Sequence, residues 1–160
     1  MLIILILKLN KLILFPDFYM MKKTFLLLFL MSLFLGCTKD TVRNTNPYIP
    51  NYNFSFVINL NLPQYIGLTS AVNPISLTEP SGITMIVMKI SDTEYRAWND
   101  YCPNQSISSC SKLIISGNVN AKCGCENYVY SLFTGVGNAQ YTLIPYRVEI
   151  LGNNSIRVYN

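Results

Sequence analysis

The sequence contains no histidine among its 160 residues. This absence excludes Ser-His and Cys-His nucleophile pairs, a histidine general base and every histidine metal ligand. Helix signals are also missing, because no segment after Cys37 combines a 3.6-residue apolar period with helix caps. We therefore expect an all-β protein that is not an enzyme and that has no metal site.

Most of the chain has almost no excess of positive over negative charge. The net charge of +4 comes largely from four lysines before Cys37, opposed there by Asp17 alone. From Thr38 onward there are eight Lys/Arg and seven Asp/Glu residues, a net charge of +1. A nearly neutral domain lacks the basic surface that binds nucleic acid, so we expect no nucleic-acid partner.

Residues 20–36 have the pattern of an export signal. Lys22 and Lys23 precede an apolar run, residues 25–35, that is too short to span a bilayer. Gly36-Cys37 then resembles a bacterial lipobox, in which Cys37 is lipidated and becomes the mature N-terminus. We expect a lipoprotein held by this anchor to a cell-envelope membrane, at the outer membrane or the periplasmic face; the alternatives are an ordinary signal peptide and an uncleaved anchor.

Residues 1–19 precede a complete signal, so we expect translation to begin at Met20 or Met21. Residues 37–53 are polar, contain two prolines and predict a tether between lipid and domain.

Residues 54–160 predict one domain of short strands. Residues 54–62 alternate between apolar and polar side chains, which is the pattern of a half-buried strand. Seven further strands are expected at 83–90, 95–99, 113–115, 119–122, 127–132, 147–151 and 156–159, and residues 64–80 predict a loop with one short strand. The pattern favours a small antiparallel barrel or sandwich.

Four of the five cysteines lie in two short loops. The first loop contains Cys102 and Cys110, and the second contains Cys123 and Cys125 on either side of a glycine. Cysteines tend to oxidise in the cell envelope, and four of them permit three disulfide pairings. A four-cysteine zinc site and a Cys-Gly-Cys thiol redox site are the alternatives.

The order of these features from residue 83 to residue 159 resembles the Rieske iron–sulfur domain. The resemblance includes a strand, a Cys-Pro loop, a hairpin, a Cys-x-Cys loop, Tyr130, a turn at Gly135 and a closing hairpin. It implies a Rieske-like barrel or sandwich. The family's four cluster-ligand positions fall on Cys102, Asn104, Cys123 and Glu126, and its loop-to-loop disulfide falls on Cys110 and Cys125.

Asn104 and Glu126 are departures from the family, which has histidine at both positions. A Rieske [2Fe–2S] cluster needs two imidazoles on one iron. The resemblance therefore supports the fold and argues against a cofactor. Because the family's two ligand cysteines lie close together, it also implies pairing of Cys102 with Cys123 and of Cys110 with Cys125.

The expected function is that of a cluster-free, disulfide-stapled module with a binding or structural role. A [2Fe–2S] electron carrier with substituted ligands is the alternative. The other conspicuous residues have simpler interpretations. We expect Trp98 to lie in the core, the tyrosines at 101, 128 and 130 to pack in the barrel, and the acids at 92 and 94 to lie in a solvated hairpin without joining Asp100 in catalysis.

Replacing Cys37 with alanine tests the anchor. Without the thiol that carries the lipid, we expect the protein to move from the membrane to the soluble fraction or to accumulate as unprocessed precursor. Fractionation and intact mass of the wild-type and Cys37→Ala proteins would measure this. Unchanged mass and unchanged membrane partitioning would contradict lipidation.

Overall fold

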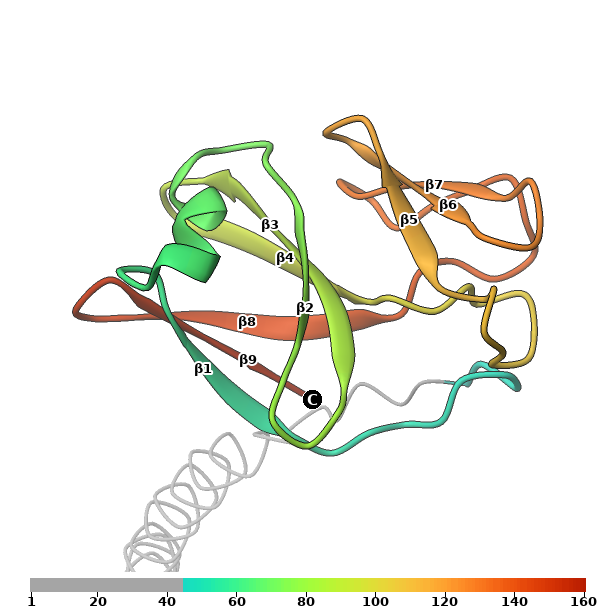
Figure 1. The fold of residues 1–160 in the computed structure, drawn as a ribbon, viewed down its shortest axis with the longest axis horizontal. Coiled ribbons are helices and arrows are strands. Elements are labelled where there is room, and N and C mark those ends of the chain that lie inside the picture. The colour runs from blue at the N-terminus through green and yellow to red at the C-terminus, as the bar shows by residue number, and fades with distance from the viewer. Residues whose placement is uncertain (1–44) are drawn as a thin grey trace, which may run out of the picture. The chain divides into compact units, whose positions relative to one another are not determined.

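The computed structural model describes residues 45–160. The predicted start, the signal and Cys37 lie outside the described residues. Within them the protein consists of nine strands and one short 3-10 helix (Figure 1): β1 (Ser55–Asn59), η1 (Pro63–Thr69), β2 (Ile75–Thr78), β3 (Thr84–Ser91), β4 (Glu94–Asn99), β5 (Leu113–Ser116), β6 (Asn120–Cys123), β7 (Val129–Ser131), β8 (Pro145–Leu151) and β9 (Ser155–Tyr159). None of the helices in this part of the chain is long and apolar enough to cross a membrane.

The strands form two antiparallel sheets. A curled six-stranded sheet has the order β1-β9-β8-β4-β3-β2, and a three-stranded sheet has the order β5-β6-β7 (Figure 1). The expected all-β, antiparallel class is confirmed. The order of elements that carried the Rieske resemblance is also present, since the smaller sheet follows β4 and precedes the closing β8–β9 hairpin.

The alternation of the first strand places its side chains as the sequence predicts. In β1, Ile58 is fully buried while its neighbour Val57 is 52% exposed. Ile58 belongs to a core cluster inside the large sheet together with Leu68, Met85, Val87, Ile156 and Val158. Burial of alternate apolar side chains of this kind is the main term that stabilises a sheet with one solvent face.

Residues 64–80 depart from the prediction, because the segment holds a helix as well as the expected short strand. β1 ends at Asn59, and Pro63 occupies a first-turn position of η1, where its missing N–H costs no hydrogen bond. No side chain caps the helix N-terminus, and its buried residue is Leu68. The helix therefore depends on tertiary burial of Leu68, which leaves no periodic signal in so short a segment.

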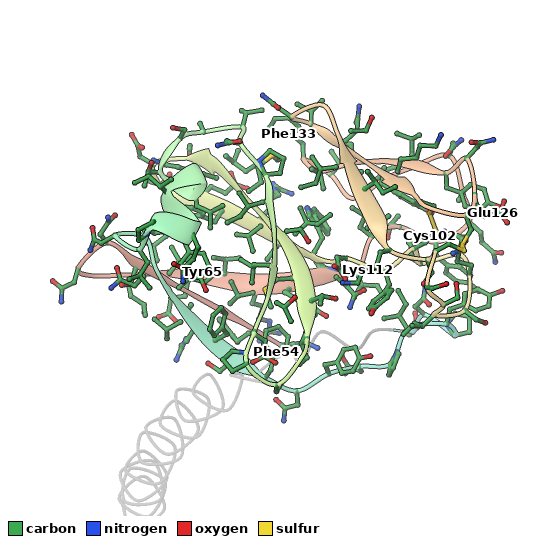
Figure 2. The ribbon with its side chains drawn as sticks, viewed as in Figure 1. Phe54, Tyr65, Cys102, Lys112, Glu126 and Phe133 are labelled. Atoms are coloured by element: carbon green, nitrogen blue, oxygen red, sulfur yellow. A yellow bond between two sulfur atoms is a disulfide. The ribbon has the colours of Figure 1, made fainter. Side chains whose placement is uncertain are left out.

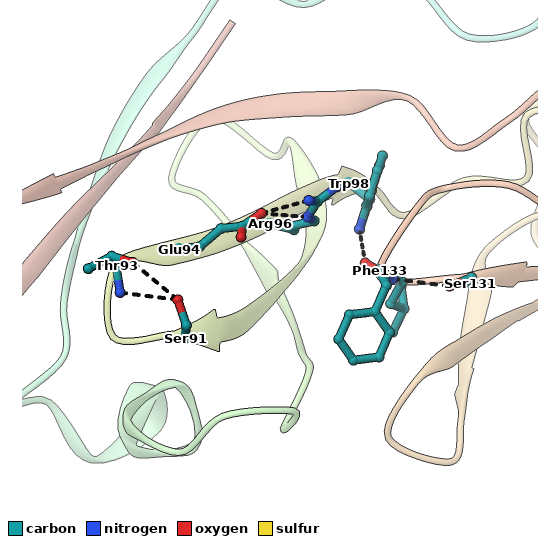
Figure 3. Close-up of polar contacts among 8 residues, drawn as sticks. Ser91, Thr93, Glu94, Arg96, Trp98, Ser131 and Phe133 are labelled. Atoms are coloured by element: carbon teal, nitrogen blue, oxygen red, sulfur yellow. Dashed lines mark hydrogen bonds and ion pairs between the residues drawn. The ribbon is translucent and has the colours of Figure 1, made fainter.

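Trp98 joins the two sheets. This residue of β4 is 5% exposed, and its indole Nε1 donates a hydrogen bond of 2.9 Å to the carbonyl of Leu132, just after β7 (Figure 3). The ring lies against Gly135, whose φ is +72°. A second core cluster surrounds the indole and includes Ile86, Met88, Leu113, Tyr130, Leu132 and Leu143. The expectation that Trp98 is a core residue is confirmed.

Replacing Gly135 with alanine tests the contact with the indole. A Cβ at this position would lie 2.7 Å from the Trp98 ring, so the variant would combine left-handed backbone strain with overpacking. We expect unfolding to become easier by about 2–4 kcal/mol.

Gly117→Ala is the matched control, because Gly117 has a φ of +62° and no atom near the added Cβ. It should cost about 1 kcal/mol, from backbone strain alone. Urea unfolding of the two variants measures the difference. Equal losses would show that the Trp98 contact is not tight.

Candidate functional site

The candidate site consists of the two cysteine-bearing loops. Loop 1 (residues 100–112) connects β4 to β5, and loop 2 (residues 124–128) connects β6 to β7. Cys123, expected in the second loop, is the last residue of β6. The structure pairs Cys102 with Cys123, with a Cα–Cα distance of 5.4 Å, and Cys110 with Cys125, with a Cα–Cα distance of 5.2 Å. This is the pairing that the Rieske resemblance implied.

Backbone contacts between the two loops add to the disulfides in holding them together. The N–H of Gly124 donates a hydrogen bond of 3.1 Å to the carbonyl of Lys112. A Cβ at residue 124 would collide with the carbonyl oxygen of Cys110. Glycine between the two cysteines therefore permits the close approach that both disulfides need.

The two disulfides lie in different environments. Cys102 and Cys123 are 0% and 1% exposed and belong to the core cluster around Trp98, so we call their bond the inner disulfide. Cys110 and Cys125 are both exposed, and their bond is the outer disulfide. Figure 2 labels Cys102 and Glu126 at the same end of the domain, where the cysteine loops lie.

Tyr130 lies beneath the inner disulfide. The side chain is fully buried, and its hydroxyl is 3.9 Å from the Sγ of Cys102. A disulfide sulfur carries no proton, so the hydroxyl is the donor in this weak contact. Burial raises the pKa of Tyr130 above its usual value, and the hydrogen bond from Asn104 opposes that effect. The hydroxyl therefore stays protonated at neutral pH.

Asn104 is held by three hydrogen bonds. Its Nδ2 donates to the hydroxyl of Tyr130 at 2.8 Å and to the carbonyl of Tyr141 at 2.7 Å. Its Oδ1 accepts from the N–H of Tyr141 at 2.9 Å. The amide thus ties loop 1 to the floor of the site and to the segment before β8. Both amide hydrogens and the amide oxygen of Asn104, which the Rieske resemblance aligns with a histidine, are thus bonded within the protein.

Glu126 contrasts with Asn104. It is exposed, and no ion pair joins it to any residue between 45 and 160. The other acids do not gather into one place. On the β3–β4 hairpin, Asp92 pairs with Lys89, as the prediction of a solvated hairpin requires. Glu94 pairs with Arg96 on the same hairpin (Figure 3).

Asp100, the first residue of loop 1, is buried. Thr84 donates a hydrogen bond to its Oδ1, and Lys112 Nζ lies 3.5 Å from its Oδ2. The ammonium of Lys112 is also 5.7 Å from the centroid of the Tyr101 ring. These contacts fix the start of loop 1 on the large sheet and give the buried carboxylate a countercharge.

A cleft of about 280 Å³ opens next to loop 1. Its lining comes from the segment before β1, the β2–β3 turn, β3, β4 and loop 1: Tyr52, Ser81, Gly82, Ile83, Thr84, Asn99, Tyr101 and Ile107. Asn99 is 1% exposed and donates through Nδ2 to the hydroxyl of Tyr146 at 2.8 Å. Burial raises the pKa of Tyr146 to about 12. The lining residues include no acidic or basic side chain.

Sequence reasoning missed several residues that support the loops. The end of the predicted tether contacts the domain, because Asn46 donates to the carbonyl of Pro103 at 2.7 Å and Ile49 is 2% exposed. Tyr141 is another missed residue, 37 positions from Asn104. No local pattern marks such contacts, because they join segments that are distant in sequence.

Comparisons with known proteins give structural likeness alone. No protein-family model matches the chain, and no curated protein sequence matches it. A solved structure assigned as an NADH-dependent nitrite reductase small subunit from Mycobacterium tuberculosis has a TM-score of 0.44 at 11% identity, and it covers 69% of this chain and 97% of its own. Another, described as the small subunit of an NADPH nitrite reductase, has a TM-score of 0.37 at 14% identity, and it covers 57% of this chain and 89% of its own.

Replacing Asn104 with alanine tests its structural role. The change removes three hydrogen bonds and leaves the buried hydroxyl of Tyr130 without its donor. We expect the free energy of unfolding to fall by about 2–3 kcal/mol. Asn127→Ala is the control, because Asn127 is an exposed loop 2 residue whose side chain has no hydrogen bond within the described residues. Urea unfolding of the oxidised proteins measures both, and similar stabilities would contradict the assignment.

Proposed function

We propose that the protein is a lipid-anchored module of the bacterial cell envelope, and that its Rieske-like domain binds a partner or supports an assembly without an iron–sulfur cluster. The anchor is Cys37, followed by a short polar segment. The disulfide-stapled loops and the neighbouring cleft form the working surface. The protein is not an enzyme in this proposal.

The arrangement of Asn104 carries the proposal. In a Rieske centre the corresponding side chain would present a nitrogen lone pair to iron. The amide nitrogen of Asn104 has no such lone pair, and both of its hydrogens are donated to Tyr130 and Tyr141. Freeing the amide oxygen for a metal would cost the hydrogen bond from Tyr141.

The other three ligand positions do not fit a cluster either. Cys102 and Cys123 are joined to each other, so neither is a thiolate in this state. Glu126 is exposed and would offer a hard, anionic oxygen in place of an imidazole. Outside the disulfides, no cluster of three or more metal-ligating side chains occurs in residues 45–160.

A binding or structural role agrees with the form of the site. The two disulfides close segments of 21 and 15 residues and hold the loops in one arrangement. Fixed loops lose less entropy when a partner binds. The cleft beside loop 1 adds a concave surface with polar and aromatic groups, on which a partner could make hydrogen bonds and ring contacts.

The absorption spectrum and metal content of the purified mature protein test this function. We expect a colourless protein without stoichiometric iron or zinc, whose melting temperature is unaffected by chelators. Strong reduction should lower the melting temperature markedly, because each disulfide contributes roughly 2–4 kcal/mol. A red-brown protein with iron and free cysteines would overturn the proposal in favour of the [2Fe–2S] electron carrier, and stoichiometric zinc would favour the four-cysteine site.

A further inference from the structure

A thiolate in solution can reach the outer disulfide but not the inner disulfide. Thiol–disulfide exchange requires a thiolate to reach a sulfur atom directly. Cys102 and Cys123 are 0% and 1% exposed, whereas Cys110 and Cys125 are exposed. A single glycine separates Cys123 from Cys125 in the chain, yet the two bonds differ sharply in their access to solvent.

Hydrogen-bond donors distinguish the two sulfurs of the outer disulfide, because an amide N–H reaches the Sγ of Cys125 while a hydroxyl lies close to both sulfurs. The Nε2 of Gln105 lies 3.1 Å from the Sγ of Cys125. The hydroxyl of Ser108 lies 3.9 Å from the same sulfur and 3.7 Å from the Sγ of Cys110. A neutral disulfide sulfur is a weak acceptor, but a thiolate is a strong one, so these donors would gain strength if Cys125 became a thiolate.

The side-chain amide of Gln105 has a hydrogen-bond partner at its nitrogen and none at its oxygen. Its Oε1 is buried and has no hydrogen-bond partner, while its N–H faces the sulfur. A buried polar atom without a partner costs free energy and is uncommon in native proteins. This orientation of the amide, with its N–H toward Cys125, would stabilise a thiolate on that residue.

We propose that the Cys110–Cys125 bond is a thiol-exchange site for an external dithiol. A thiolate of the dithiol attacks Cys110 Sγ and forms a mixed disulfide. The outer S–S bond breaks, and its electron pair leaves on Cys125, where Gln105 and Ser108 donate to the thiolate.

The second thiol of the dithiol then attacks the mixed disulfide and releases Cys110 as a thiolate. The dithiol is oxidised to a disulfide by two electrons, and Cys110 and Cys125 receive those electrons. The two protons of the dithiol balance the two new thiols. The inner disulfide takes no part.

Opening the outer bond changes loop 1 and leaves the domain folded. The outer disulfide bonds Cys110 of loop 1 covalently to Cys125 of loop 2. Residues 106–109, which precede Cys110, are all exposed. Ile107 in this segment lines the cleft. Exchange at the outer disulfide would therefore alter the cleft while the inner disulfide and the Trp98 core hold the two sheets together.

A graded reduction of the full-length protein, purified in detergent, tests the site. The probe is dithiothreitol, followed by alkylation of free thiols and peptide mapping. We expect Cys110 and Cys125 to become alkylated at a concentration at least about tenfold lower than Cys102 and Cys123, with the fold retained. Reduction of both bonds at one concentration, or only together with unfolding, would overturn the proposal.

Two further measurements test the direction of attack. With limiting glutathione as a monothiol probe, the mixed disulfide should form on Cys110; formation mainly on Cys125 would overturn the assigned direction. Gln105→Leu should slow reduction of the outer bond several-fold without lowering the stability of the oxidised protein, since it also removes the unpaired oxygen. An unchanged rate in this variant would show that Gln105 does not stabilise the leaving thiolate.

Discussion

The contact between Trp98 and the chain around Gly135 fixes how the small sheet sits on the large one. The indole extends from β4, donates to the carbonyl of Leu132 and packs against a glycine that has no side chain to obstruct it. A large aromatic side chain with a satisfied N–H contributes both apolar burial and orientation. Loop 1 begins directly after β4, and loop 2 leads into β7, the strand that Leu132 follows. The contact therefore positions one strand next to each cysteine loop.

The disulfides act on loops that packing has already placed. Gly124 contacts the backbone of Cys110, and the inner disulfide belongs to the same core cluster as Trp98. A disulfide stabilises chiefly by limiting the unfolded chain, so two of them help a small domain whose usual margin is roughly 5–15 kcal/mol. The difference in exposure divides their roles, because a buried bond is kinetically protected and an exposed bond is available for exchange.

Asn104 lies at the position that the Rieske resemblance aligns with a histidine ligand, and its contacts are those of a structural residue. A neutral imidazole offers one donor and one acceptor, whereas an amide offers two donors and an oxygen acceptor. The two donors of Asn104 reach Tyr130 and Tyr141, and its oxygen accepts from the backbone of Tyr141. Three parts of the chain meet at this one side chain. The loops keep an arrangement that the Rieske resemblance implied, while internal hydrogen bonds occupy the groups that would face a ligand.

The sequence alone determined the strands and their turns, because period-two alternation and turn residues act over a few neighbouring positions. It also located the cysteine loops and Trp98. The disulfide pairing came from the resemblance, since spacing left three pairings open. Only the tertiary structure decided the helix around Leu68, the contact of Asn46 with Pro103, the hydrogen bonds of Asn104 and the contrast in exposure between the two disulfides. These features depend on which distant segments exclude water from one another, and a local pattern of residue types does not encode that choice.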